Sequence, residues 1–187
     1  MAIEYIVPNA DNSDGSWTNN VGNNTDLYSY VDNGISGGTV DNNTFIQSST
    51  TTTVALDIGT IAGTRTASSD VIFRYMHSGN FITHTVALYE GATQIWESFQ
   101  QNIDASAGFI ENEQTIPSND IDNITDYSDL NVRVTNSFGA GLMKVSEIEL
   151  EFDTDGGGGG GGSSVADFIR FENGCMSDFR GMVDIRG

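Results

Sequence analysis

A serine flanked by glycines is the first feature of this chain that suggests catalytic chemistry. Residues 34–38, GISGG, match the G-x-S-x-G pattern of hydrolases, in which a serine nucleophile sits on a sharp turn between a strand and a helix. Ser36 is followed instead by TVDNNTFIQ, a turn and then a strand-like run. We therefore expect a chance match, no catalytic residue and no enzyme.

Seven consecutive glycines at residues 156–162 suggest phosphate binding, because glycine-rich loops bring backbone N–H groups close to phosphates. A dinucleotide fingerprint needs a strand before the loop and a long helix after it, and only 25 residues follow here. Asp153 and Asp155 also place negative charge beside the run. We interpret the glycines as a flexible linker with a root-mean-square span of roughly 15 Å.

Histidines and loop carboxylates are the candidate metal ligands. His77 and His84 flank the sequence Ser-Gly-Asn and are expected to face each other across a hairpin, but two imidazoles alone do not complete a zinc site. Asp120, Asp122 and Asp126 offer oxygen ligands for Ca²⁺, although a solvated acidic loop explains them better. We predict no metal site and no cofactor.

Two tryptophans are the candidate ligand-binding aromatics. Trp17 and Trp96 can stack on sugar rings if they lie on the surface, and they pack in the core if they do not. Core packing is the more common outcome for such residues.

The elements that position these residues are predicted to be strands, because β-branched and aromatic residues cluster in short alternating runs. The runs are residues 2–7, 27–32, 43–48, 51–58, three runs within 69–103 separated by turns at 78–80 and 90–92, 131–137, and 142–152. The polar stretch 8–24 is predicted to be a long turn region, and 118–130 a short helical or looped connection. The alternation in the last run shifts by one residue near Ser146, as a β-bulge would cause.

These runs predict an all-β fold, an antiparallel two-sheet sandwich of jelly-roll type. An immunoglobulin-like sandwich is an alternative, although its Cys–Trp–Cys marker is absent. The expected organisation is a sandwich domain at 1–155, a poly-glycine linker at 156–162 and a C-terminal tail at 163–187.

The charge of the chain lies in the predicted sandwich. Four Lys or Arg side chains face 22 acidic ones there, a net charge near −18. Such a surface repels phosphate backbones and anionic headgroups, so we expect neither nucleic acid nor membrane as a partner. The first residues have no basic and apolar leader pattern, and the chain has one cysteine, Cys175, so we expect folding in a reducing cytosol.

The tail contains too much apolar surface to stay free in water and too little chain to fold alone. It is expected to dock on its own sandwich or to anchor the chain to another subunit. The candidate anchor residues are Val165, Phe168, Ile169, Arg170, Phe171, Met176, Phe179, Arg180, Met182, Ile185 and Arg186.

Four segments, DGSWTNNVGNNTDLYSYVD, DNNTFIQSS, ITDYSDLNVRV and VSEIELEF, resemble a β-sandwich module of tailed-phage virion proteins that commonly lies near a glycine-rich linker. The resemblance covers most of residues 11–152. It implies a non-enzymatic structural protein, most simply a capsid decoration or head-fibre protein whose acidic sandwich faces solvent.

The same resemblance implies partners and a location. The partners would be the major capsid protein or other virion subunits, within a homo-oligomer for which a trimer is the favoured state. The protein would be made in the host cytoplasm and end on the virion surface. The alternative is a carbohydrate-binding module of a tail or head fibre.

Overall fold

The computed structural model describes residues 2–36, 41–66, 69–137 and 141–155. The chain divides into two units, Met1–Gly157 and Gly158–Gly187, and the described residues all belong to the first. The linker 156–162, the tail 163–187 and the eleven candidate anchor residues lie outside the described ranges, so the predicted anchor stays a prediction.

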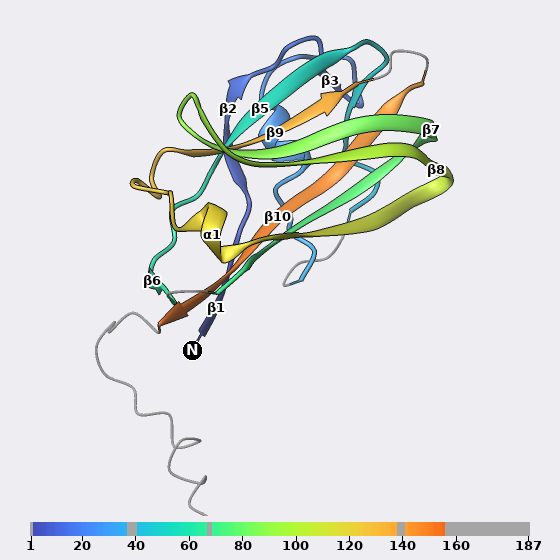
Figure 1. The fold of residues 1–187 in the computed structure, drawn as a ribbon. Coiled ribbons are helices and arrows are strands. Elements are labelled where there is room, and N and C mark those ends of the chain that lie inside the picture. Colours follow the sequence, from blue (N-terminus) through green and yellow to red (C-terminus); the bar gives the residue numbers. More distant parts are fainter. Residues whose placement is uncertain (1, 37–40, 67–68, 138–140, 156–187) are drawn as a thin grey trace, which may run out of the picture. The chain divides into compact units, whose positions relative to one another are not determined.

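The regular secondary structure of the described residues is almost entirely β-strand (Figure 1). None of its helices is long and apolar enough to cross a membrane. The elements in chain order are β1 (Ala2–Ile6), β2 (Pro8–Ser13), β3 (Thr18–Asn19), the 3-10 helix η1 (Leu27–Tyr30), β4 (Ile46–Ser48), β5 (Thr52–Ile58), β6 (Thr64–Arg65), β7 (Val71–Glu90), β8 (Thr93–Ile116), α1 (Ser118–Ile121), β9 (Leu130–Asn136) and β10 (Met143–Asp155).

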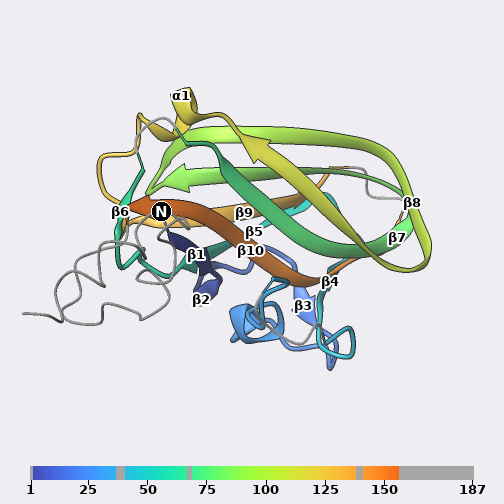
Figure 2. The same ribbon diagram turned by 90° about the horizontal axis from the view of Figure 1, so that it is seen from below.

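Two antiparallel sheets pack face to face, which confirms the predicted sandwich of jelly-roll type (Figure 2). In the first, called sheet A here, β10 pairs with β1 and β4 on one side and with β6 and the first half of β7 on the other, and the second half of β8 follows β7. The second, sheet B, has the order β2, β5, β9, second half of β7, first half of β8.

The long β7–β8 hairpin belongs to both sheets. The register of this hairpin shifts repeatedly between His77 and His84, where the two strands pass from one layer to the other. A Cβ atom at Gly79 would lie 2.9 Å from the carbonyl oxygen of Leu142, so only glycine fits this crossing without a backbone shift. The turn predicted at residues 78–80 is therefore wrong, because its glycine marks a bend within one strand. The turn at 90–92 is confirmed.

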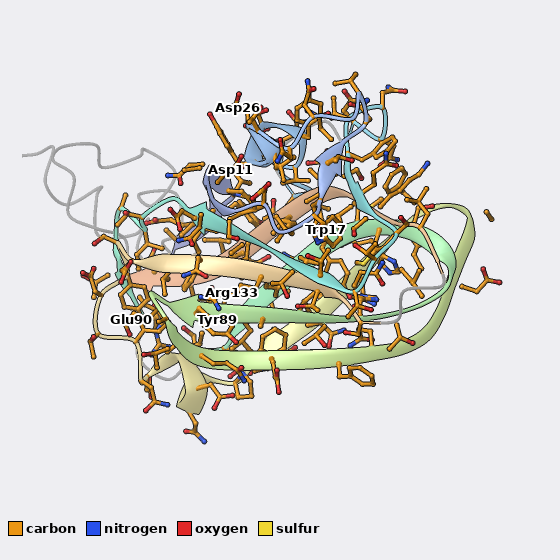
Figure 3. All side chains as sticks on the ribbon, turned by 90° about the horizontal axis from the view of Figure 1, so that it is seen from above. Asp11, Trp17, Asp26, Tyr89, Glu90 and Arg133 are labelled. Carbon is orange, nitrogen blue, oxygen red and sulfur yellow. The ribbon has the colours of Figure 1, made fainter. Side chains whose placement is uncertain are left out.

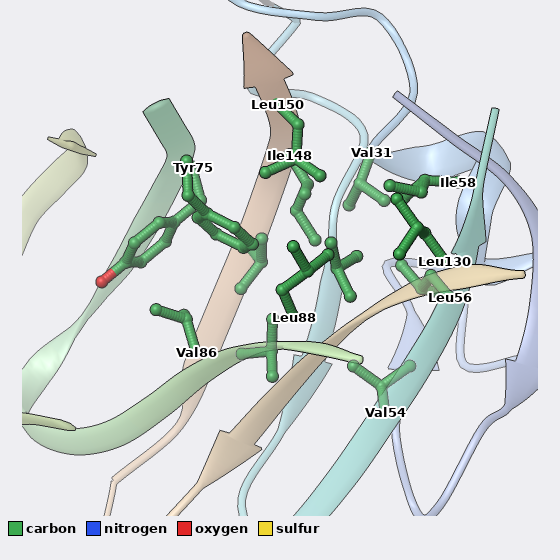
Figure 4. Close-up of a cluster of buried hydrophobic side chains, with 14 of the residues drawn as sticks. Val31, Val54, Leu56, Ile58, Tyr75, Val86, Leu88, Leu130, Ile148 and Leu150 are labelled. Carbon is green, nitrogen blue, oxygen red and sulfur yellow. The ribbon is translucent and has the colours of Figure 1, made fainter. Parts of the chain in front are cut away.

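The core lies between the sheets and is built from the alternate residues of each strand (Figure 4). Val54, Leu56 and Ile58 of β5 and Val132 and Val134 of β9 point inward and are buried. From sheet A, β10 adds Ile148, Leu150 and Phe152 after the register shift between Val145 and Glu147, which confirms the predicted bulge. The opposite side of each strand therefore faces outward.

The N-terminal region differs from the sequence-based prediction. The polar stretch expected to be a turn contains β2 and β3, and the run 27–32 expected to be a strand contains η1. Asp11 of β2 explains both differences, because its carboxylate accepts hydrogen bonds from the backbone N–H groups of Leu27 (2.9 Å) and Tyr28 (2.8 Å). These bonds hold the start of a helix against the strand and bury Leu27.

Candidate functional site

The outward face of sheet B is the candidate site, and we call it the sheet-B face. Its residues alternate with the buried ones of β5, β9 and β7, so their outward direction follows from the strand period of two. Antiparallel registers align them in three rows across the strands β5, β9, β7 and β8. The rows are Thr53–Thr135–Thr85–Phe99, Ala55–Arg133–Ala87–Glu97, and Asp57–Asn131–Tyr89–Gln94.

Short side chains leave a shallow open hollow on this face. Ala55 and Ala87 flank Arg133 in the middle row, where longer side chains would fill the surface. The hollow has a volume of about 270 Å³ and lies where β2, β5 and β9 adjoin. Its lining residues are Asn12, Ser13, Thr53, Ala55 and Arg133. Four of the five side chains are neutral and short, so a ligand can approach the sheet closely.

Arg133 is the one cation of the three rows. Its guanidinium stacks on the ring of Tyr89, 3.6 Å from the ring centroid (Figure 3). Its Nε donates to Oδ1 of Asn131 at 3.0 Å and its Nη2 donates to the carbonyl oxygen of Gly91 at 3.1 Å. The Tyr89 hydroxyl in turn donates to Oε1 of Gln94 at 2.8 Å. The guanidinium is thus held in one orientation before any ligand binds.

The remaining polar groups of the face form neighbouring pairs. The hydroxyls of Thr53 and Thr135 lie 2.7 Å apart, and Nδ2 of Asn12 donates to Oδ1 of Asp57 at 2.7 Å. At the β8 edge the side chain of Phe99 is 59% exposed. The face therefore combines fixed hydrogen-bonding groups with one exposed apolar ring.

The outward face of sheet A has a different character. Arg74 on β7 forms ion pairs with Glu113 of β8 and with Glu149 and Glu151 of β10, and Glu111 lies 3.8 Å away. The cation is thus surrounded by carboxylates of its own sheet. This face is acidic, the charge of Arg74 is compensated within the protein, and Glu149 itself is buried.

Ser36 takes part in structure rather than in a nucleophile site. Its hydroxyl donates to Oε1 of the buried Glu149 at 2.7 Å, and the backbone N–H groups of Ile35 and Ser36 donate to Oε2 at 2.9 and 3.0 Å. No strand directly precedes Ser36 among the described residues, so the geometry of a nucleophile turn is absent there. That the match to the hydrolase pattern arose by chance stays a prediction, and the hydrogen bond of the Ser36 hydroxyl to Glu149 supports it.

A second buried carboxylate lies next to Glu149 on the same strand. Glu147 is fully buried, and this burial raises the pKa of its carboxyl to about 7. Its Oε1 accepts a hydrogen bond from the backbone N–H of Asp41 at 3.0 Å. Glu147 thus holds the segment before β4 against the sheet.

The two histidines lie together in the core. The rings of His77 and His84 are 5.0 Å apart between centroids, and Nε2 of His84 is 2.7 Å from the hydroxyl of Tyr75. Burial lowers the pKa of His77 to about 4 and that of His84 to about 3, and the neighbouring His77 lowers the latter further. In the described ranges no group of three or more His, Cys, Asp or Glu residues could hold a metal ion.

The candidate sugar-binding tryptophans do not lie on the sheet-B face. Trp17 is fully buried and its indole N–H donates to the carbonyl oxygen of Thr52 at 3.3 Å, so the favoured core packing is confirmed for Trp17 and the possible glycan contact is wrong. Trp96 pairs with the inward-facing Leu88, and its half-buried ring packs 6.0 Å from that of Phe73. A glycan contact by the exposed part of Trp96 stays a prediction.

The acidic loop considered for Ca²⁺ has protein partners. Asp122 forms an ion pair with Arg65, and the carboxylate of Asp126 accepts hydrogen bonds from the backbone N–H and the hydroxyl of Ser128 at 2.8 and 2.6 Å. The carboxylates of Asp122 and Asp126 thus stabilise the conformation of this loop.

Sequence reasoning missed the residues of the sheet-B face. Val132 and Val134 are strongly apolar neighbours of Arg133, so strand alternation alone was enough to place Arg133 outward. The partners on β5, β7 and β8 follow only from pairings between distant segments, which a single sequence does not reveal.

Comparisons with known proteins found likeness at the level of the fold. No family model matches the chain, and no curated protein matches it. Similar solved structures include a carbohydrate-binding module from Cellvibrio mixtus lichenase 5A in complex with cellotriose, with 11% identity over 82% of this chain and 99% of that chain and a TM-score of 0.42. A family 29 carbohydrate-binding module has 10% identity over 81% and 90% with a TM-score of 0.45. A Stig cyclase from Fischerella sp. has 9% identity over 82% and 77% with a TM-score of 0.39.

Proposed function

We propose that this protein binds a glycan on the sheet-B face. The observation that carries the proposal is the hollow beside Arg133, which is surrounded by hydroxyl and amide groups, with the exposed Phe99 at the far end of the Thr53 row. Sugar hydroxyls need donors and acceptors at fixed positions, and the apolar side of a sugar ring packs on an aromatic ring. The Thr53–Thr135 pair and Asn12 supply the first, and Phe99 supplies the second.

The dimensions of the face suit an extended ligand. Five strands from β2 to β8 lie side by side, which gives a width of roughly 19 Å at about 4.8 Å per strand. A short oligosaccharide running across the strands would pass the hollow, the Arg133–Tyr89 stack and Phe99 in turn.

The arrangement favours binding over hydrolysis. The two carboxylates of the three rows are Asp57 on β5 and Glu97 on β8, three strand spacings apart, or roughly 14 Å. Glycoside hydrolysis needs an acid pair about 5 to 9.5 Å apart. The carboxylate of Asp57 is moreover hydrogen-bonded to Asn12.

The test is electrophoresis of the native protein through gels that contain soluble polysaccharides. At least one polysaccharide should retard the protein, and Phe99→Ala should reduce the retardation at least fivefold. Tyr5→Ala is the matched control, because Tyr5 is an exposed aromatic residue (44%) on the outward face of sheet A. Equal loss in both variants, or no retardation by any polysaccharide, would refute the proposal.

A virion role stays a prediction from the sequence resemblance. The tail on which anchoring would depend lies outside the described residues. Glycan binding on sheet B is compatible with such a role, since it corresponds to the alternative of a glycan-binding fibre module.

A further inference from the structure

The positively charged side chains of the sandwich differ in whether carboxylates neutralise them. Arg65 pairs with Asp122, and Arg74 pairs with glutamates on both sides of it. Lys144 lies over the ring of Phe45, 4.6 Å from its centroid. Among the described residues no carboxylate lies within 4.0 Å of the Arg133 guanidinium, although the sandwich contains 22 acidic side chains.

The hydrogen bonds of Arg133 leave part of its guanidinium unused. Nε and Nη2 each donate one bond, to Asn131 and to the Gly91 carbonyl. A guanidinium has five N–H groups, so Nη1 and the second N–H of Nη2 have no acceptor among the described residues. These two nitrogens form the fork that binds a carboxylate through two parallel hydrogen bonds.

The surroundings of this fork favour an anionic group from outside the protein. The other residues that line the hollow, Asn12, Ser13, Thr53 and Ala55, are all neutral. Asp57, a nearby carboxylate in the rows, is turned to Asn12. Stacking on Tyr89 holds the guanidinium plane in place, so little side-chain entropy is lost when a ligand binds.

We propose that the sheet-B face selects glycans with a carboxylate-bearing sugar, and that Arg133 binds this carboxylate. The inference rests on the proposed function and names its ligand class. The net charge near −18 opposes the approach of a long polyanion, but at physiological salt this repulsion is screened beyond about 8 Å. The contact with Arg133 is short-range, so it acts within that distance.

The experiment uses the full chain and pairs of polysaccharides that differ only in the carboxyl group. Pectate, alginate, glucuronoxylan and hyaluronan are each compared with their carboxyl-reduced forms, together with neutral β-glucan, mannan and galactan. Affinities come from the retardation in native gels at 0.15 M salt. We expect at least one acidic glycan to bind at least tenfold more tightly than its reduced form.

Two variants assign this preference to the guanidinium. Arg133→Gln should abolish the preference for the acidic form, and Arg133→Lys, which keeps the charge but not the fork, should keep only part of it. Lys144→Gln is the matched control, because it removes one positive charge from the outward face of sheet A, and it should change affinity less than twofold. Thermal unfolding of each variant confirms that it folds. Should Arg133→Gln not fold, the comparison of acidic and carboxyl-reduced glycans with the wild type and with Arg133→Lys still tests the carboxylate inference.

The outcomes separate the two proposals. Retardation by neutral glycans, or by an acidic glycan and its reduced form alike, would overturn the carboxylate inference and leave glycan binding in place. An acid preference that Arg133→Gln leaves intact would also overturn it. No retardation by any polysaccharide would overturn the proposed function itself.

Discussion

The buried histidine pair makes the stability of the sandwich depend on pH, and replacing His77 by leucine tests this. His77 is fully buried, and neither of its ring nitrogens has a hydrogen-bond partner among the described residues. Its pKa falls to about 4 in the folded protein because burial disfavours the imidazolium ion, whereas an exposed histidine has a pKa of about 6.5.

The sign and size of the effect follow from this pKa difference. Between pH 6.5 and pH 4 the unfolded chain binds a proton at position 77 and the folded chain does not, so acidification favours unfolding. From pH 7 to pH 5 the difference amounts to about 2 kcal/mol for His77. His84, whose pKa is about 3, adds a loss of the same sign.

The assay is urea unfolding at pH 7 and pH 5 for the wild type and for His77→Leu. The quantity compared is the change in unfolding free energy between the two pH values, so a uniform effect of the substitution cancels. The wild type should lose about 2 kcal/mol more than the variant on acidification. A difference below about 0.5 kcal/mol would show that His77 is protonated or solvated in the folded state, and the reasoning would fail.

Three further predictions concern other buried or connecting groups. Glu147→Gln should change the pH dependence of stability in the opposite direction to His77→Leu. Burial raises the pKa of Glu147 to about 7, so the folded state of the wild type gains stability as pH falls from 7 towards 4.5. The variant should lack this gain in the same urea assay. Trp17→Ala should cost about 3 to 5 kcal/mol in unfolding free energy, since it empties a fully buried site, and at temperatures where the variant stays folded it should leave glycan binding unchanged. If the tail joins subunits, light scattering should show the full chain as an oligomer and a chain that ends at Asp155 as a monomer. Finding both chains to be monomers would contradict intermolecular anchoring.

Strand alternation predicted the parts of the fold in which one side of a strand is buried and the other is exposed. Strands β5 and β9 lie within one residue of their predicted ends and β10 starts within one residue of its predicted start, because Val, Leu and Ile recur there at every second position. β2 was missed because Asn9, Asn12 and Ser13 give it the composition of a turn. Its position depends on pairing with β5 and on the Asp11 carboxylate, which binds the distant backbone at Leu27 and Tyr28.

The candidate site shows the same division between local and long-range information. That Arg133 faces outward follows from its two valine neighbours, but its lack of a carboxylate partner depends on which residues the registers place around it. Ala55 and Ala87 stand beside it where Glu149 and Glu113 stand beside Arg74 on sheet A. Each arginine lies on the outward side of a strand that is paired on both edges, and the cross-strand neighbours of the two differ. Those neighbours neutralise Arg74 within the fold and leave Arg133 with unused hydrogen-bond donors. A negatively charged ligand group should therefore bind on sheet B rather than on sheet A.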